Sequence, residues 1–315
     1  MEFTEELFLD HGILISEEEW HKRIEILRNE TKDAKGGEPF FTAIDTERKN
    51  LHDILVSAIK RRLEAHQGER IGLFFSGGLD SSFIAAICKS LGHDVLCVTV
   101  GFQDTETNTQ VPLDIRAAGN VALALGLNFV QRIYDYDAAE AIIKKTCLLL
   151  RPHANPINAA VGSVVVAAAE FAKTHGVTVL FSGLGSEEIY AGYERHAKSE
   201  DVHEECWYGL KQMYSRDLIR DCTLAEKLGI TVLTPFLDPA VILQSMKFPP
   251  RTKLNIEGSK LILREIAKPY LGEHALRKKK AAQYGSAFQK ALEKVARKDG
   301  VTIKEYIGRL NASVQ

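Results

Sequence analysis

The residues Ser76–Ser82, which read SGGLDSS, have the types and spacing of a loop that binds a phosphate-like anion. They follow an apolar run at 71–75 that is typical of a buried strand, and they lead into an apolar-periodic segment that predicts a helix. Two adjacent glycines let the backbone approach an anion, while the free amides and dipole of a helix N-terminus favour negative charge. The alternative is an ordinary tight turn before a capped helix. The spacing fits neither GxxxxGK[ST] nor GxGxxG, which excludes a Walker loop and a dinucleotide-binding fingerprint.

A second stretch, Phe181–Tyr193, repeats the pattern of strand, glycine loop, hydroxyls and carboxylates at a helix start. Carboxylates beside a phosphate loop suit Mg²⁺, because this ion prefers hard oxygen ligands and bridges to phosphate oxygens. We therefore predict that Asp80 and Glu187 bind magnesium. The alternative is that Glu187 and Glu188 are first-turn charges that interact with the helix dipole. The anion loop predicted beside them favours the metal site.

Buried strands alternate with helices up to about residue 193, which predicts a parallel sheet covered by helices on both faces. The predicted strands are 71–75, 95–100, 128–133 and 177–181, and the main helices between and before them are 47–66, 114–125, 138–150 and 159–175. From about residue 194 the pattern is mostly helical, with helices expected at 203–228, 239–246, 259–270 and 287–296. Polar, glycine-containing loops follow three of the strands. Because ligands bind beyond the carboxyl ends of parallel strands, we expect these loops around one crevice.

The composition narrows the class of protein. A net charge of −2 over 315 residues gives no electrostatic support for binding nucleic acid or a membrane surface. No apolar run approaches the ~18 residues typical of a transmembrane helix, and the N-terminus lacks the basic start and apolar core of a signal peptide. The five cysteines form no CxxC pair, so we interpret them as reduced thiols. These features predict a cytoplasmic protein.

Four motifs follow one another along the chain: SGGLDSS at Ser76–Ser82, SGLGSEEIYAGY at Ser182–Tyr193, PFLD at Pro235–Asp238 and KLILR at Lys260–Arg264. In this order they resemble the synthetase domain of the asparagine synthetase family, which includes β-lactam synthetase and is one of the N-type ATP pyrophosphatases, or PP-loop proteins. The resemblance covers about residues 50–286. It implies an α/β fold of the adenine nucleotide alpha hydrolase type with a helical C-terminal part, and it implies ATP and Mg²⁺ as cofactors.

The resemblance also implies residue roles. The ATP and pyrophosphate positions, taken with the loop itself, are Leu73, Ser76, Gly77, Gly78, Asp80, Ser81, Ser82, Val100, Ser182, Gly183 and Lys279. The family's two magnesium ligands fall on Asp80 and Glu187, with Glu in place of the second Asp. Its pyrophosphate-stabilising lysine falls on Lys260. An Arg-x-Lys that closes over phosphate in the family matches Arg277 and Lys279.

Lys260 and Arg264 are spaced i,i+4 on a predicted helix, so both cationic heads can reach one anion and serve as catalytic residues. The alternative is a solvated basic helix face, which is also the alternative for the run at 277–280. Leu184, Asp217 and Arg220 match positions that line the family's substrate region. The alternative for Asp217 and Arg220 is an ordinary surface pair.

The chain also departs from the family pattern. Leu184 stands where the family usually has Glu, and Thr231 and Leu233 stand where it usually has Glu and Arg before PFLD. These positions face the amino-acid substrate in the family, so we expect weak selectivity for aspartate. The family's glutaminase part begins with a cysteine after the initiator Met, whereas this chain begins Met1-Glu2-Phe3. We therefore expect the isolated chain not to hydrolyse glutamine.

These observations predict an N-terminal helical appendage at 1–45 and a synthetase-like ATP pyrophosphatase domain at 46–315, with an α/β core at about 46–193 and a helical part at about 194–315. The predicted enzyme is an AMP-forming ligase that adenylates a small carboxylate, by default aspartate, and amidates it with ammonia or an amine. A separate glutaminase is a candidate partner. Two other hypotheses are a PP-loop tRNA-modifying enzyme, which the charge and the absence of CxxC oppose, and a non-catalytic ATP-binding subunit paired with a glutaminase.

Overall fold

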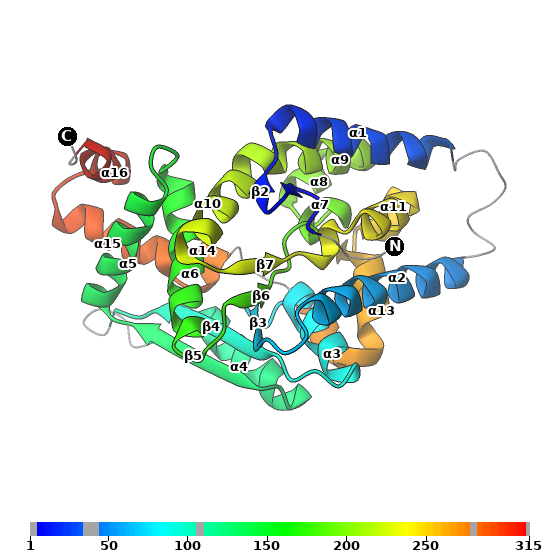
Figure 1. The fold of residues 1–315 in the computed structure, drawn as a ribbon, viewed down its shortest axis with the longest axis horizontal. Coiled ribbons are helices and arrows are strands. Elements are labelled where there is room, and N and C mark those ends of the chain that lie inside the picture. The colour runs from blue at the N-terminus through cyan, green and yellow to red at the C-terminus, as the bar shows by residue number, and fades with distance from the viewer. Residues whose placement is uncertain (1–4, 34–43, 105–109, 278–281, 313–315) are drawn as a thin grey trace.

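The computed structural model describes residues 5–33, 44–104, 110–277 and 282–312. A five-stranded sheet lies at its centre, with the order β5-β4-β3-β6-β7 and every pairing parallel (Figure 1). The strands are β3 (Ile71–Phe74), β4 (Leu96–Phe102), β5 (Phe129–Tyr134), β6 (Val179–Phe181) and β7 (Thr231–Leu233). The register sets Leu73 beside Cys97 on one side and Phe181 on the other. The predicted parallel α/β fold is confirmed.

Helices cover both faces of the sheet because successive strand residues point to opposite sides. Leu73 and Phe181 belong to one hydrophobic cluster, whereas Val98 and Leu180 belong to another. The first cluster includes side chains of α2 (Ile44–Ala65), α3 (Leu79–Ser90) and α4 (Leu113–Leu125). The second includes side chains of α5 (Tyr136–Leu149), α6 (Pro156–Lys173), α15 (Phe288–Lys298) and α16 (Ile303–Ala312). The sheet is therefore buried on both sides.

The segment expected as one helix at 203–228 is divided. It consists of α9 (Val202–Met213), a π-helical turn η1 (Tyr214–Leu218) and α10 (Ile219–Leu228). Strand β7 follows and pairs with β6, so the central sheet receives a strand from the part predicted to be mostly helical. The sequence pattern did not reveal this strand, because its three residues lie among segments with helical periodicity.

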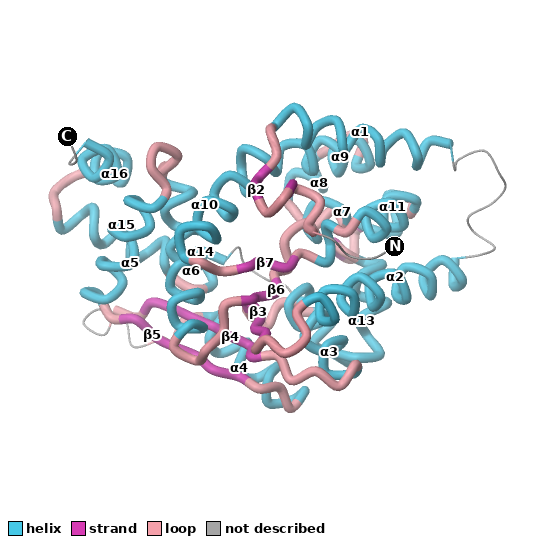
Figure 2. Tube along the Cα trace, in the orientation of Figure 1, coloured by secondary structure: helices cyan, strands magenta, loops and turns pink. Residues whose placement is uncertain are grey.

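The remaining elements complete the described part of the chain, and Figure 2 shows that most of them are helices or turns. They are α7 (Ser186–Ile189), α8 (Glu194–Lys198), η2 (Pro235–Leu237), α11 (Pro239–Lys247), α12 (Pro250–Lys253), β8 (Leu254–Asn255), β9 (Gly258–Ser259), α13 (Leu261–Leu271), η3 (Gly272–Leu276) and α14 (Ala282–Gly285). Within the described ranges no helix combines the length and the apolar composition that a membrane span requires.

The N-terminal segment shares the core with the sheet. It forms a small hairpin, β1 (Leu9–Asp10) and β2 (Ile13–Leu14), and then α1 (Glu17–Asp33), which runs beside α9 (Figure 1). Ser16 Oγ accepts the amide of Glu19 at 3.2 Å and so caps the start of α1. Trp20 is fully buried in the same cluster as Leu73 and donates its indole N–H to the Leu210 carbonyl at 2.9 Å. The division of the chain at residues 45 and 193 stays a prediction.

Candidate active site

The order of the strands reverses between β3 and β6. From β3 the chain proceeds outward to β4 and β5, and it then returns to the other side of β3 to form β6 and β7. In open α/β sheets, ligands bind in the crevice at such a reversal, beyond the carboxyl ends of the strands. The two glycine loops follow these two strands, and a Cβ added at Gly183 would lie 3.0 Å from the Cβ of Asp80. The loops therefore contact one another at the reversal.

The first loop is held by its own serines. Ser81 Oγ lies 3.4 Å from the Ser76 amide, from which it accepts, and 3.4 Å from the Gly78 carbonyl, to which it donates. Gly77 has a φ of +63°, and a Cβ there would lie 2.7 Å from Ala118 on α4, so both the conformation and the space require glycine. Gly78 caps α3 without a side-chain hydrogen bond, so no capping side chain occupies the N-terminus of this helix, where an anion would bind.

Ser82 supplies a further polar atom beside this loop. It is 1% exposed, and its hydroxyl finds no hydrogen-bond partner among the described residues. Buried polar groups are normally paired, so an unpaired hydroxyl in the first turn of α3 is consistent with a ligand contact. The predicted anion-binding roles of the loop residues remain predictions.

Lys260 lies at the centre of the crevice and joins the two loops. Its ammonium donates to both carboxylate oxygens of Asp80 at 2.8 Å and to the hydroxyl of Ser186 at 3.1 Å. It also forms an ion pair with Oε1 of Glu187 at 2.8 Å. Lys260 is 5% exposed and Asp80 6%. The structure thus brings together the predicted lysine and both predicted magnesium ligands.

Backbone geometry makes this meeting possible. Lys260 immediately precedes α13 and has a φ of +57°, a left-handed conformation that is uncommon for a residue with a side chain. Such conformations occur often at functional sites. A Cβ added at Gly192 would lie 1.8 Å from Oε2 of Glu187 and 2.4 Å from Cε of Lys260. Only glycine at position 192 lets these two side chains approach each other across the loop.

The electrostatics of the cluster favour a bound cation. Burial lowers the pKa of Lys260, but Asp80 and then Glu187 raise it, and the net direction is upward. Since carboxylate oxygens of Asp80 and Glu187 both lie 2.8 Å from one nitrogen, they converge on a point where a positive charge is held. Mg²⁺ is usually bound by one or two carboxylates together with substrate phosphates. The two residues therefore fit the predicted metal, and their role as ligands stays a prediction.

Arg264 does not share an anion with Lys260 in the way the i,i+4 spacing suggested. The helix begins at Leu261, after Lys260, so the two are not on one regular helix face. The Arg264 guanidinium donates instead to the carbonyls of Ser259 at 2.9 Å and Ala275 at 2.5 Å. Burial lowers its pKa. The arginine fixes the backbone around the site, and its proposed catalytic role stays a prediction.

Of the Arg-x-Lys pair, Arg277 donates to the carbonyl of Gly77 at 2.6 Å, so it touches the back of the first loop. Lys279 lies outside the described residues. Leu73 and Val100, predicted near adenosine, are buried strand residues whose side chains pack in the core. Any contact they make with a nucleotide would involve the backbone.

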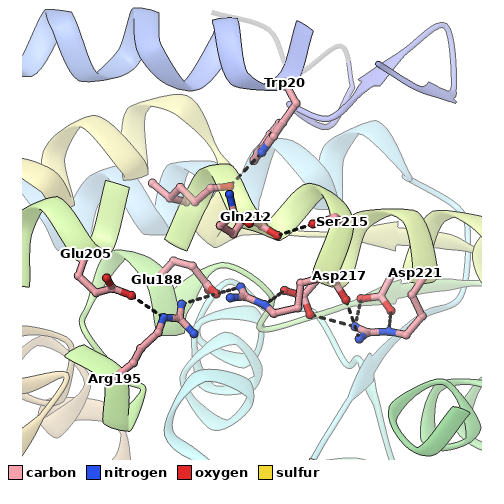
Figure 3. A network of polar contacts seen from close by, with 11 residues as sticks. Trp20, Glu188, Arg195, Glu205, Gln212, Ser215, Asp217 and Asp221 are labelled. Carbon is pink, nitrogen blue, oxygen red and sulfur yellow. Dashed lines mark hydrogen bonds and ion pairs between the residues drawn. The ribbon is translucent and has the colours of Figure 1, made fainter. Parts of the chain in front are cut away.

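A ladder of alternating charges lies beside the second loop, on α7, η1 and α10 (Figure 3). Arg216 donates to Glu188 and, at 2.7 Å, to Asp217. Arg220 donates to Asp217 at 3.3 Å and to Asp221 at 2.7 and 3.0 Å. Asp217 and Arg220, predicted in the substrate region, are thus buried partners of one another. Their charges are largely satisfied inside the protein.

The sequence interpretation missed Arg216 and gave Glu188 no role. Burial raises the pKa of Glu188 to about 8, although Arg216 acts to lower it. The Arg216 guanidinium also lies over the ring of Tyr193, 5.4 Å from its centre. The π-helical turn that carries Arg216 is a feature enriched at functional sites. The repeated Arg-Asp dipeptide at 216–217 and 220–221 is a signal that could have revealed the ladder, since i,i+4 residues share a helix face.

The positions where the chain departs from the family pattern differ in exposure. Leu184 is half-buried and its amide donates to Ser182 Oγ at 3.3 Å. Leu233 is buried in the core, and its carbonyl accepts the amide of Ser182 at 2.8 Å. Thr231 is exposed at the start of β7. None of the three is charged, so these positions give a substrate no ion pair.

Comparison with known proteins is consistent with this site. The family model described as asparagine synthase matches residues 50–201 and 196–298. A Methanocaldococcus jannaschii protein whose name refers to glutamine-hydrolysing asparagine synthetase is 29% identical over 290 residues, which covers 78% of this chain and 52% of that protein. The asparagine synthetase [glutamine-hydrolyzing] of Gallus gallus is 28% identical over 238 residues, covering 74% of this chain and 42% of the relative.

An asparagine synthetase domain-containing protein of Saccharomyces cerevisiae is also similar, with 29% identity over 286 residues, 78% of this chain and 54% of the yeast protein. The chain thus spans about half the length of the curated relatives it matches. The matched part includes both glycine loops and Lys260. The match to the family model begins at residue 50, so it does not include the N-terminal segment that contains Trp20.

Proposed function

The chain belongs to the asparagine synthase family, and on that premise we propose that it is an ATP-dependent ligase that forms an amide with release of AMP and pyrophosphate. One observation supports this most directly: a buried lysine is shared by carboxylates from both glycine loops at the strand reversal. An ammonium held there can compensate the charge of a departing pyrophosphate.

In the proposed first step, an oxygen of the substrate carboxylate attacks the α-phosphorus of ATP, and the bond to the bridging oxygen of pyrophosphate breaks. The N-terminus of α3, which has no side-chain cap, and the buried Ser82 hydroxyl, which has no partner among the described residues, would hold the phosphate groups. Lys260 would stabilise the charge that develops on the leaving oxygen. Mg²⁺, held by Asp80 and Glu187, would neutralise charge on the phosphates.

In the proposed second step, ammonia or an amine attacks the carbonyl carbon of the acyl adenylate, and AMP leaves. Aspartate is the default acyl substrate because the relatives are named as asparagine synthetases. The nitrogen could be supplied as free ammonia or by a separate glutaminase acting as a partner. The half-buried Leu184 and the ladder at Arg216 and Asp217 would border the acyl group, since they adjoin the second loop.

The experiment that tests this proposal is product analysis. The purified protein is incubated with Mg²⁺, ATP, ammonium and a panel of carboxylates that includes aspartate, and nucleotides are separated by chromatography. We expect AMP and pyrophosphate in equal amounts with at least one carboxylate, and no such products from Asp80→Asn. ADP and free phosphate as the only products would refute the proposed reaction.

A further inference from the structure

Glu6 lies outside the matched family region, yet it contacts the segment that follows β7. Its carboxylate is 3% exposed and accepts two hydrogen bonds from Arg62, at 2.8 and 2.9 Å. It also accepts the amide of Thr234 at 3.1 Å and the hydroxyl of Thr234 at 2.5 Å. Arg62 in turn donates to Asp238 at 3.0 Å. Both ends of the PFLD turn are thus tied to the same buried ion pair.

The turn held by Glu6 packs against the second glycine loop. Gly185 has a φ of +95°, and a Cβ there would lie 2.4 Å from Cδ2 of Leu237 and 3.5 Å from the backbone of Phe236. The ring of Phe236 also meets the ring of Tyr190 edge-on, with 6.1 Å between centroids. Leu237 thus fills the space that a side chain at position 185 would occupy, and because protein interiors are packed as densely as organic crystals, a shift of the turn would displace the loop.

The second glycine loop, against which this turn packs, carries two residues of the candidate active site. Gly185 caps α7, whose first two residues are Ser186 and Glu187. Both contact the ammonium of Lys260, at 3.1 and 2.8 Å. A continuous series of contacts therefore leads from Glu6, through the turn at 234–237 and Gly185, to the lysine.

We propose that Glu6 is a positioning residue that sets the second glycine loop against Lys260 through the Pro235–Leu237 turn. This inference rests on the proposed function for its kinetic part. A buried ion pair is a poor source of net stability, because desolvation offsets most of its attraction. Two of the four hydrogen bonds that Glu6 accepts come from the amide and hydroxyl of Thr234 and fix the position of this residue. The geometry of an adenylating site is sensitive to shifts of about 1 Å.

The test replaces Thr234 with valine, which removes the hydroxyl donor to Glu6 and keeps the shape of the side chain and the ion pair with Arg62. We expect kcat for pyrophosphate formation to fall about tenfold, the usual effect of one hydrogen bond to a charged group, with the KM for ATP within about twofold. We also expect faster amide hydrogen exchange in residues 183–193. Glu6→Gln should act in the same direction and more strongly, at some cost in folding yield because Arg62 loses one of its two charged partners and keeps only Asp238.

Thr174→Val is the matched control. Thr174 is exposed at the end of α6, and its hydroxyl donates to the Phe171 carbonyl at 2.7 Å, so the same substitution removes a hydroxyl hydrogen bond, here to a backbone carbonyl, far from the turn. It should leave kcat and exchange in 183–193 unchanged. If Thr234→Val only lowers the melting temperature, with native kcat and native exchange in 183–193, the positioning role is overturned. If the native protein itself forms no pyrophosphate with any carboxylate, the proposed function fails, and the exchange measurement alone decides the positioning role.

Discussion

Replacing Lys260 with methionine keeps a long apolar side chain and removes the charge that joins the two loops. Asp80, Glu187 and Lys260 together carry a net charge of −1, and the variant carries −2 at the same place. Because the ammonium is already neutralised by carboxylates 2.8 Å away, it adds little to the binding of ATP in the ground state. In the proposed reaction, its charge would be used most when pyrophosphate departs.

The expected effect follows from this difference. Loss of one preorganised donor to a developing charge costs about 10²–10³-fold in kcat. The affinity for Mg²⁺–ATP should change by less than about tenfold. Removing one member of a buried ion pair also destabilises the fold by about 3–5 kcal/mol. Mg²⁺ without nucleotide should recover more stability in the variant than in the native protein, since Asp80 and Glu187 no longer hold the ammonium.

The assay is pyrophosphate exchange into ATP under saturating carboxylate, with ATP affinity measured separately by calorimetry and unfolding followed in urea. Lys268→Met, at an exposed position on the same helix, is the control and should match the native protein. Equal losses in ATP affinity and in exchange rate would show that Lys260 only binds the ground state, and the reasoning above would be refuted.

Three further predictions concern the surroundings of this lysine. Gly192→Ala should lower kcat by about 100-fold, because the new Cβ would lie 1.8 Å from Oε2 of Glu187. The control is Gly308→Ala on α16, where a new Cβ would have no atom within 4 Å. This variant should be harmless or stabilise the protein by roughly 0.5–1 kcal/mol in thermal unfolding. Glu188 has its pKa raised to about 8, so the folded protein retains a proton that the unfolded chain releases near pH 4.5, and stability from this group is lost as the pH rises between these values. The measurement compares the free energy of unfolding of Glu188→Gln with that of the native protein as the pH is raised. The variant's value minus the native value should rise by at most about 1.4 kcal/mol per pH unit between these two pKa values and level off above them. A difference that does not change with pH would contradict the raised pKa. In a carboxylate panel assayed by pyrophosphate exchange, aspartate should show weak saturation, and a clear preference for aspartate would show that other residues replace the charges absent at Leu184.

The sequence predicted those parts of the candidate site whose residues are close together along the chain. The strand, glycine turn and helix start at Ser76–Ser82 occur within a few residues, so their physical logic is visible in the sequence. That the loop at Ser182–Tyr193 would meet it followed from a rule about parallel sheets rather than from any contact in the sequence. The convergence of Asp80 and Glu187 was predicted in this way, and the structure shows both within 2.8 Å of Lys260.

Long-range contacts and unusual backbone conformations could not be predicted. The left-handed conformation of Lys260 places it before the helix rather than on it, and no local signal marks this in a sequence that reads as a continuous helical pattern. Arg264 was expected to face an anion, whereas backbone carbonyls that only the tertiary fold brings near take its donors. Glu6 and Thr234 are separated by 228 residues, so their hydrogen bonds have no counterpart in the sequence pattern.

The two sides of the crevice differ in how their charges are arranged, and this difference bears on the substrate. On the side that we propose binds the nucleotide, Lys260 and its two carboxylates would exchange partners with a metal and a phosphate. On the other side, the arginines at 216 and 220 already face acids within the ladder, and a substrate carboxylate would have to compete with them. Each charged contact that is not available is worth about 1.5–3 kcal/mol, or roughly ten- to hundredfold in affinity. We therefore predict that an acyl group with a second carboxylate gains little here, and that a less charged carboxylate is used better than aspartate.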